Sequence, residues 1–121
     1  MAYEIETIGN QTELPLSTAV RAGNFIFCSG QVPIDDAGKV QRGSITSETE
    51  RVLDALKATL ESAGSALDRV VKTTVILTEP SDFEEFNEVY GRYFPNNPPA
   101  RTTFCAKLLV DARIEIDAIA A

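Results

Sequence analysis

Arg101 is the residue in this sequence that is best suited to bind an anion. It follows Pro98, Pro99 and Ala100, and the two prolines favour an extended backbone because their rings fix φ and move the preceding residue away from the α region. An alternating run that predicts a strand begins at Arg101, so its backbone is held on both sides. A guanidinium held in this way suits the two-pronged capture of a planar carboxylate or phosphate. A plain surface arginine at the start of a strand is the alternative interpretation.

Glu115 is the second candidate. In the run 114–119 isoleucines alternate with acidic residues, so Glu115 and Asp117 are expected on the strand face opposite the isoleucines. Partial burial would raise the pKa of Glu115 and a nearby Arg101 would lower it, and the sequence does not decide which effect is larger.

The two strands that carry Arg101 and Glu115 are expected to form a hairpin. They span residues 101–110 and 113–120 and are separated by a tight connection at Asp111-Ala112. In such a hairpin Glu115 lies several residues from the turn, while Arg101 lies at the far end of the partner strand. The two side chains therefore need not meet within one chain, and they could meet across a subunit contact.

Ser29, Gly30 and Asn87 are candidates for lining a binding site. Ser29 and Gly30 close an apolar strand that begins at Phe25, and a small hydroxyl followed by a residue without Cβ lets a ligand approach the backbone. A strand that simply ends at a turn is the alternative. Asn87 adjoins the apolar face of a predicted helix, where its amide can be satisfied by backbone or can face a ligand.

These residues are positioned by an alternation of strands and helices. The first helix is expected to begin with a Ser47–Glu50 capping box and to end at Gly64. The second is expected to begin with a Ser81–Glu84 capping box and to stop at Pro95, and its aromatic stripe from Phe83 to Phe94 is expected to be core. The first strand is expected at 3–8, ending at Gly9-Asn10, and a loop follows at 11–18. Two strands at 19–22 and 25–30 are expected about a turn at Gly23-Asn24, and a further strand at 70–77.

This order predicts one α+β domain over residues 1–121, a mixed sheet with both helices on one face. Several strands, notably Phe25 to Cys28 and Val71 to Leu77, are apolar on both faces. A second subunit is therefore expected to cover the other face of the sheet.

Composition limits the function classes. The 121 residues, 44% hydrophobic and 24% charged, are typical of a globular domain, and the net charge of −7 disfavours nucleic acid and anionic membranes as partners. Histidine, the commonest general base and metal ligand, is absent, and no other set of metal ligands is evident, so no metal is expected. Cys28 and Cys105 lie in apolar runs and are expected to be buried free thiols. The acidic N-terminus and the lack of a long apolar run predict a cytoplasmic location.

Several separated motifs resemble the Rid family of enamine/imine deaminases, also called the YjgF or L-PSP endoribonuclease family. The resemblance runs from about Pro15 to Ala120. It rests on the segments 27–33 (FCSGQVP), 71–75 (VKTTV), 99–103 (PARTT) and 114–116 (IEI). It implies a chorismate-mutase-like α+β fold assembled as a homotrimer, with ligand clefts between subunits.

The resemblance also implies residue roles. Arg101 matches the arginine that binds the substrate carboxylate, and Glu115 matches the glutamate associated with the attacking water. Ser29, Gly30 and Asn87 match positions that line the same cleft. Thr103 stands where many members have a cysteine, and Leu16 stands where many have a tyrosine.

The expected activity is hydrolysis of a 2-enamine or 2-imine acid to a 2-keto acid and ammonia, without a cofactor. Such a reaction needs a fixed carboxylate, an aimed water and a proton relay, which Arg101 and Glu115 can supply. Because Leu16 removes a hydroxyl from the pocket, a larger catabolic substrate such as 2-aminomuconate is one alternative. Another is a regulatory module that binds keto acids without turnover. A ribonuclease is disfavoured by the absent histidine and the negative charge.

Overall fold

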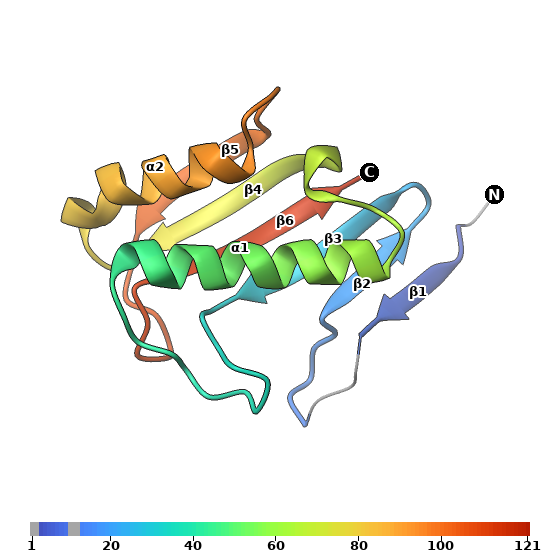
Figure 1. The fold of residues 1–121 in the computed structure, drawn as a ribbon. Helices are drawn as coiled ribbons and strands as arrows, with labels where there is room; N and C mark the ends of the chain where they lie inside the picture. The colour runs from blue at the N-terminus through green and yellow to red at the C-terminus, as the bar shows by residue number, and fades with distance from the viewer. Residues whose placement is uncertain (1–2, 10–12) are drawn as a thin grey trace.

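A computed structural model describes residues 3–9 and 13–121 of the chain. The predicted turn residue Asn10 and the first two residues of the predicted 11–18 loop lie outside the described residues. Two helices cover one face of a mixed sheet (Figure 1), which confirms the predicted α+β architecture. The six strands lie side by side in the order β1-β2-β3-β6-β4-β5. The elements are β1 (Ile5–Ile8), β2 (Ala19–Ala22), β3 (Phe25–Gln31), α1 (Ile45–Ser62), β4 (Val70–Leu77), α2 (Phe83–Tyr93), β5 (Ala100–Cys105) and β6 (Ile114–Ala120).

Helix α1 begins three residues before the predicted start. Its N-cap is Ser44, whose Oγ accepts a hydrogen bond from the backbone N–H of Ser47 at 3.1 Å. The predicted Ser47–Glu50 capping box is therefore wrong. The physical reason is that Ile45 is already a buried core residue, so the apolar face of the helix starts before Ser47 and the first serine of the segment becomes the cap.

The predicted end of α1 at Gly64 is confirmed. Gly64 has a φ of +81°, a conformation that suits a residue without Cβ. Its N–H donates to Glu61 O at 3.1 Å, and the N–H of Ser65 donates to Leu60 O at 2.8 Å. These two bonds form a Schellman motif, which satisfies carbonyls that the helix end would leave unpaired.

Helix α2 also starts differently from the prediction. A short 3-10 turn (Pro80–Asp82) leads directly into the helix, and the N-cap residue Asp82 makes no side-chain capping bond. The Ser81–Glu84 box is wrong because Ser81 lies inside that turn. The end is as predicted, since the helix stops at Tyr93 before Pro95.

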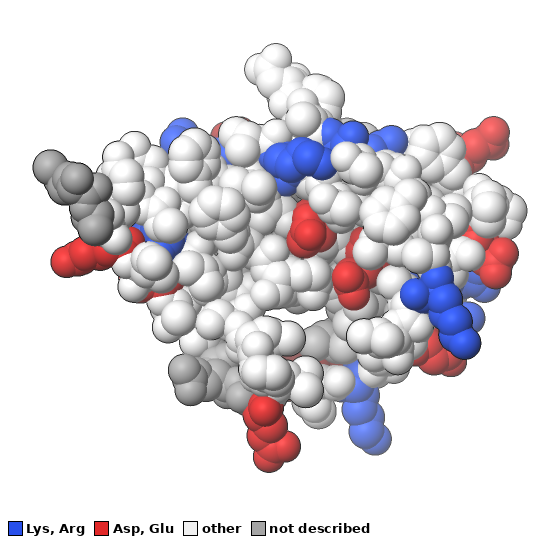
Figure 2. Space-filling view, turned by 180° about the vertical axis from the view of Figure 1, so that it is seen from behind, with Lys and Arg blue, Asp and Glu red and all other residues white. Residues whose placement is uncertain are grey.

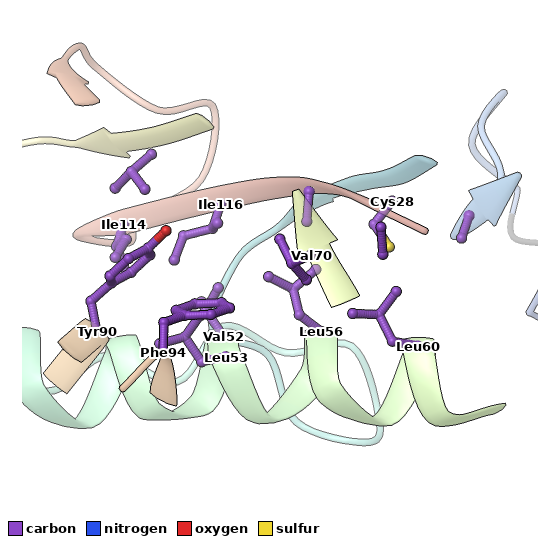
Figure 3. Packing of buried hydrophobic residues seen from close by; sticks show 14 of the residues in the cluster. Cys28, Val52, Leu53, Leu56, Leu60, Val70, Tyr90, Phe94, Ile114 and Ile116 are labelled. Atoms are coloured by element: carbon purple, nitrogen blue, oxygen red, sulfur yellow. The ribbon is translucent and has the colours of Figure 1, made fainter. Parts of the chain in front are cut away.

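The core lies between the helices and the sheet. In Figure 3 the leucines of α1 point toward strand residues such as Ile116 and Val70. Tyr90 of α2 and Phe94, the residue after that helix, fill the space beside them. Full burial of one such leucine stabilises the fold by about 1.5–3 kcal/mol. The residues that are less than 2% exposed include Leu53, Leu56, Leu60, Leu77, Phe86, Ile26, Ile114 and Ile116.

The predicted hairpin of the last two strands is wrong. Strand β5 ends at Cys105 and pairs in parallel with β4, at the edge of the sheet. Strand β6 pairs antiparallel with both β3 and β4. The connecting segment 106–113 therefore crosses the end of β4 instead of making a tight turn. Alternation indicates which face each residue takes, but it does not identify the neighbouring strand.

The face of the sheet that the helices leave bare, here called the open face, carries large apolar side chains. Phe25 and Phe27 of β3 are each 45% exposed, Phe104 of β5 is 46% exposed and Ile5 of β1 is 74% exposed. Figure 2 shows this face as mostly uncharged, with acidic atoms near its middle. The strands are thus apolar on both faces, as predicted, and the second subunit expected to cover them stays a prediction.

The two cysteines differ in burial. Both are free thiols, but Cys28 is buried and Cys105 is exposed at the end of the edge strand, so the prediction of burial is wrong for Cys105. Burial, and then the nearby Asp117 charge, raises the pKa of Cys28 to about 11. Its thiol therefore stays protonated at neutral pH. Within residues 3–9 and 13–121, no helix is long and apolar enough to cross a membrane.

Candidate functional site

Arg101 lies on the helix-covered face of edge strand β5. It pairs in register with Thr73 of β4, whose side chain is buried under α2. The guanidinium carbon of Arg101 lies 4.9 Å from the ring centroid of Tyr90, 5.2 Å from that of Phe86 and 5.8 Å from that of Phe83. We call these three rings of α2 the aromatic cage. Arginine packs readily on such rings because its planar guanidinium is weakly hydrated.

The guanidinium of Arg101 differs from those of the other half-buried arginines in its polar contacts. Arg21 donates to the carbonyl of Ala63 and lies 3.5 Å from a Glu6 carboxylate oxygen. Arg113 lies 3.2 Å from a carboxylate oxygen of Asp82. By contrast, no described residue accepts a hydrogen bond from the guanidinium of Arg101 or forms an ion pair with it. Its donors are therefore available to an external anion.

Two further predicted residues lie on the same strand face as Arg101 or on the same side of α2 as its rings. Thr103 pairs in register with Val75 and so shares the helix-covered face of β5. Asn87 stands four residues after Phe83 and three before Tyr90, which places it on the same side of α2. Asn87 is half-buried, and its amide makes no hydrogen bond to another described residue. Arg101, Thr103 and Asn87 thus form one cluster at the β5 edge.

Glu115 lies on the open face, as the alternation predicted, in register with Ile76 of β4. Its carboxylate packs against Gly30: a methyl group built at Gly30 would stand 2.7 Å from Glu115 Oε2. Only glycine therefore leaves room for this carboxylate. Burial, and secondly the charge of Asp117, raises the pKa of Glu115. Arg101 does not contribute to this shift, so burial sets its direction, and the carboxyl is better suited to exchange protons near neutral pH.

Ser29 and Leu16 are connected to Glu115 indirectly, through Ser17 and Gly30. Ser29 Oγ donates to Ser17 O at 2.5 Å, and Ser29 N–H donates to Thr18 O at 2.9 Å. These bonds tie the segment before β2 to the irregular end of β3, where Gly30 contacts Glu115. Leu16 is 51% exposed in that segment. Ser29, Gly30, Glu115 and the Leu16 segment form a second cluster.

The two clusters do not form one site within a chain. Strand β4 separates β5 from β6, and Arg101 lies on the helix-covered face of the sheet whereas Glu115 lies on the open face. The sequence left open whether these residues meet within one chain, and the register shows that they do not. Among the described residues, no group of three or more His, Cys, Asp or Glu side chains could hold a metal ion.

The aromatic cage is the part of the site that the sequence did not reveal. The stripe that contains Phe83, Phe86 and Tyr90 was expected to be core, and this is confirmed for Phe86 and Tyr90. Phe83 is 42% exposed and packs against Arg101 instead. The signal in the sequence was the spacing of the three rings by three and then four residues, which brings them to one side of a helix. It does not indicate an arginine from another strand.

Burial raises the pKa of the Tyr90 hydroxyl, although its hydrogen bond to Thr73 and the Arg101 charge act in the opposite direction. The oxygens of Tyr90 and Thr73 are 2.8 Å apart, and Figure 3 shows the Tyr90 hydroxyl pointing toward the sheet. The Tyr90 ring is therefore fixed at both ends, by its helix and by β4.

Comparison with known proteins places this domain in a family. The model of the family described as Endoribonuclease L-PSP matches residues 8–121. A RutC family protein of Pyrococcus abyssi is 46% identical over 108 residues, which cover 88% of this chain and 85% of that protein. The chloroplastic Reactive Intermediate Deaminase A of Arabidopsis thaliana is 41% identical over 108 residues, which cover 88% of this chain and 58% of that protein.

The fold agrees with these relatives. A crystal structure of a protein from Thermotoga maritima superposes on this chain with a TM-score of 0.91 at 43% identity, over 96% of each chain. The chain therefore belongs to the Endoribonuclease L-PSP family, which includes the RutC and Reactive Intermediate Deaminase (Rid) proteins. The resemblance to the Rid family is thereby confirmed.

Proposed function

We propose that this protein hydrolyses 2-imino acids, and the enamines in equilibrium with them, to 2-keto acids and ammonia. The observation that carries this proposal is Arg101, a half-buried guanidinium that packs on three aromatic rings and has no acceptor among the described residues. The relative named Reactive Intermediate Deaminase A supports the same reaction class. Arg101 would bind the substrate carboxylate with two parallel N–H···O bonds.

The reaction needs one water and one proton acceptor. In the proposed mechanism Glu115 accepts a proton from a water molecule whose oxygen forms a bond to C2 of the protonated imine. The resulting carbinolamine receives that proton on nitrogen, the C2–N bond breaks, and its electron pair leaves with ammonia. Loss of the hydroxyl proton gives the keto acid. A carboxyl whose pKa is raised by burial suits both proton transfers.

The cleft is proposed to lie between two copies of the chain, in a homotrimer. Arg101 and Glu115 lie on opposite faces of the sheet in one chain, so a small imino acid cannot reach both. The exposed aromatic side chains Phe25, Phe27 and Phe104 of the open face would be covered by the neighbouring copy. Arg101 of one chain would then face Glu115 of another.

The proposal is tested by coupling an amino-acid dehydratase, which releases an imine, to detection of the keto acid. Wild type should accelerate keto-acid formation, and Arg101→Ala should lower kcat/KM by at least about 100-fold because a charged bidentate contact is lost. Arg51→Ala is the matched control, since Arg51 is an exposed arginine without an ion pair among the described residues. Equal rates for wild type and Arg101→Ala would reject the proposal.

Two further measurements, keto-acid binding and RNA cleavage, distinguish the deaminase from a regulatory module and from a ribonuclease. Saturable binding of a keto acid that depends on Arg101, without faster loss of the imine, would indicate a regulatory module instead. The family description also contains the word endoribonuclease, but a net charge of −7 and the absence of histidine weigh against attraction and cleavage of RNA. RNA cleavage that remains with the protein through every purification step would reverse that judgement.

The exposed Leu16 bears on substrate size. A leucine adds apolar surface to the segment tied to Ser29, which favours a substrate larger than the imine of a small amino acid, such as 2-aminomuconate. Leu16→Tyr should shift preference toward the smaller substrate by about tenfold, the effect of one polar contact of ~1.4 kcal/mol. An unchanged ratio of kcat/KM for the two substrates would contradict this expectation.

A further inference from the structure

We propose that the aromatic cage is a positioning device, which holds the Arg101 guanidinium in its binding orientation before the substrate arrives. Phe83, Phe86 and Tyr90 would be positioning residues, because they contact the guanidinium and not the substrate. This inference rests on the proposed function, in which Arg101 binds the carboxylate.

The cage holds the guanidinium without using its hydrogen-bond donors. All three ring centroids lie within 5.8 Å of the guanidinium carbon. A ring face attracts the cation from above the guanidinium plane, so the N–H donors that lie in that plane stay available. The rings are also uncharged, so the positive charge of Arg101 is not neutralised. A carboxylate partner, such as Asp82 for Arg113, would occupy the donors that the substrate needs.

The cage is itself rigid. The Tyr90 ring centroid lies 5.3 Å from that of Phe86 and 4.7 Å from that of Phe94. The Tyr90 hydroxyl is hydrogen-bonded to Thr73 at 2.8 Å, and Thr73 is the β4 residue in register with Arg101. Strand β4 therefore pairs with the strand that carries the arginine and also anchors the Tyr90 ring.

A fixed guanidinium strengthens binding because its rotamer entropy is lost during folding and not during binding. Without the rings, Arg101 would have to be ordered by each ligand, so the Kd for a carboxylate should rise. Since the carboxylate is held equally in the ground and transition states, the change should appear mainly in KM, with kcat nearly unchanged. A purely structural role would instead lower the folded fraction and leave KM and Kd unchanged.

Three substitutions test the cage. Phe83→Leu removes the half-exposed ring at little risk to folding and should weaken binding of pyruvate, used as the 2-keto acid probe, about threefold. Tyr90→Leu should weaken it about tenfold, because the nearest ring is lost. Tyr90→Phe keeps the ring and should bind within about twofold of wild type. Tyr93→Leu is the matched control on α2, since the Tyr93 hydroxyl bonds Asp54 and not the Arg101 cluster.

The measurements are pyruvate titration of the purified full-length protein and ¹⁵N relaxation of the Arg101 Nε–H group. Arg101 Nε should be ordered in wild type and Tyr93→Leu and mobile in Phe83→Leu and Tyr90→Leu. If wild type and Arg101→Ala bind pyruvate equally, the proposed function fails, and this inference fails with it. If binding depends on Arg101 but Phe83→Leu and Tyr90→Leu retain the wild-type Kd and an ordered Nε, the inference alone is overturned.

Discussion

The buried carboxylate of Glu48 and the half-buried guanidinium of Arg101 have opposite surroundings. Glu48 is 1% exposed, and both of its oxygens are engaged: Oε1 accepts from the N–H of Arg113 at 2.7 Å, and Oε2 accepts from the N–H of Gly43 at 3.0 Å. The Arg113 side chain adds an ion pair at 3.9 Å. Arg101 packs only on uncharged rings, and no described residue accepts its N–H groups.

The difference distinguishes a charge whose partners all lie within the fold from a charge that is free to bind an external ligand. Glu48 connects α1, the loop before it and the segment that enters β6, so its hydrogen bonds hold three parts of the fold together. A charge satisfied in this way has no remaining capacity for a ligand. Arg101 and Glu115 keep that capacity, and both lie where a second molecule can reach them. Removing Glu48 should therefore affect stability, whereas removing Arg101 should affect binding.

The largest expected effect is on stability. Glu48→Ala leaves the N–H groups of Gly43 and Arg113 without their charged acceptor, so the free energy of unfolding should fall by about 3–5 kcal/mol, although the Arg113 guanidinium keeps Asp82 as a partner. Urea denaturation measures this change. Glu50→Ala is the control, because Glu50 forms only an exposed pair with Arg92 at 3.8 Å and should change stability by less than about 1 kcal/mol. Similar losses in the two variants would contradict the structural assignment of Glu48.

The next effect is on turnover. A methyl group at position 30 would stand 2.7 Å from Glu115 Oε2, so Gly30→Ala must displace that carboxylate. A displacement of about 1 Å can lower kcat by up to roughly 100-fold. The control is Gly91→Ala in α2, where a Cβ meets no atom within 4 Å and should be neutral or slightly stabilising. Wild-type kcat in Gly30→Ala would show that the position of Glu115 does not matter.

The smallest effect is the pH dependence of stability. Burial raises the pKa of Glu115 in the folded state, so the folded chain binds this proton more tightly than the unfolded chain. Stability is therefore lost as pH rises from the unfolded pKa through the folded pKa. Glu115→Gln removes this loss, so the free energy of unfolding of the variant relative to wild type should be higher at pH 7 than at pH 3. The difference should be at most about 1 kcal/mol, because the carboxyl is partly exposed. Urea denaturation at both pH values, with exposed Glu61→Gln as control, checks this; an equal effect at both values would contradict it.

Local patterns predicted most of the fold, and long-range pairing accounts for its errors. The periodicity of α1 and the Gly64 cap are properties of neighbouring residues, and both were predicted. The hairpin failed because β6 inserts between β3 and β4, and an alternating sequence fits several neighbours equally well. The start of α1 was misplaced because two serines compete for the cap, and packing of Ile45 selects Ser44.

The candidate site was predictable in composition but not in arrangement. Alternation placed Glu115 and Asp117 on the correct face, and local patterns singled out Arg101, Ser29, Gly30 and Asn87. The resemblance to the Rid family added Thr103 and Leu16. The contact of Gly30 with Glu115 depends on a register shift near the end of β3, and the cage depends on the placement of α2 over β5. Both are tertiary features, and neither leaves a signal in the local sequence.

The most direct test of the account is complementation between two inactive variants. If each site takes Arg101 from one chain and Glu115 from another, Arg101→Ala and Glu115→Gln should each lack imine hydrolysis. Co-refolding equal amounts of the two variants should then give sites that contain both intact residues, with about a quarter of wild-type activity in a randomly mixed closed oligomer. A mixture that stays as inactive as either variant alone would contradict the shared site.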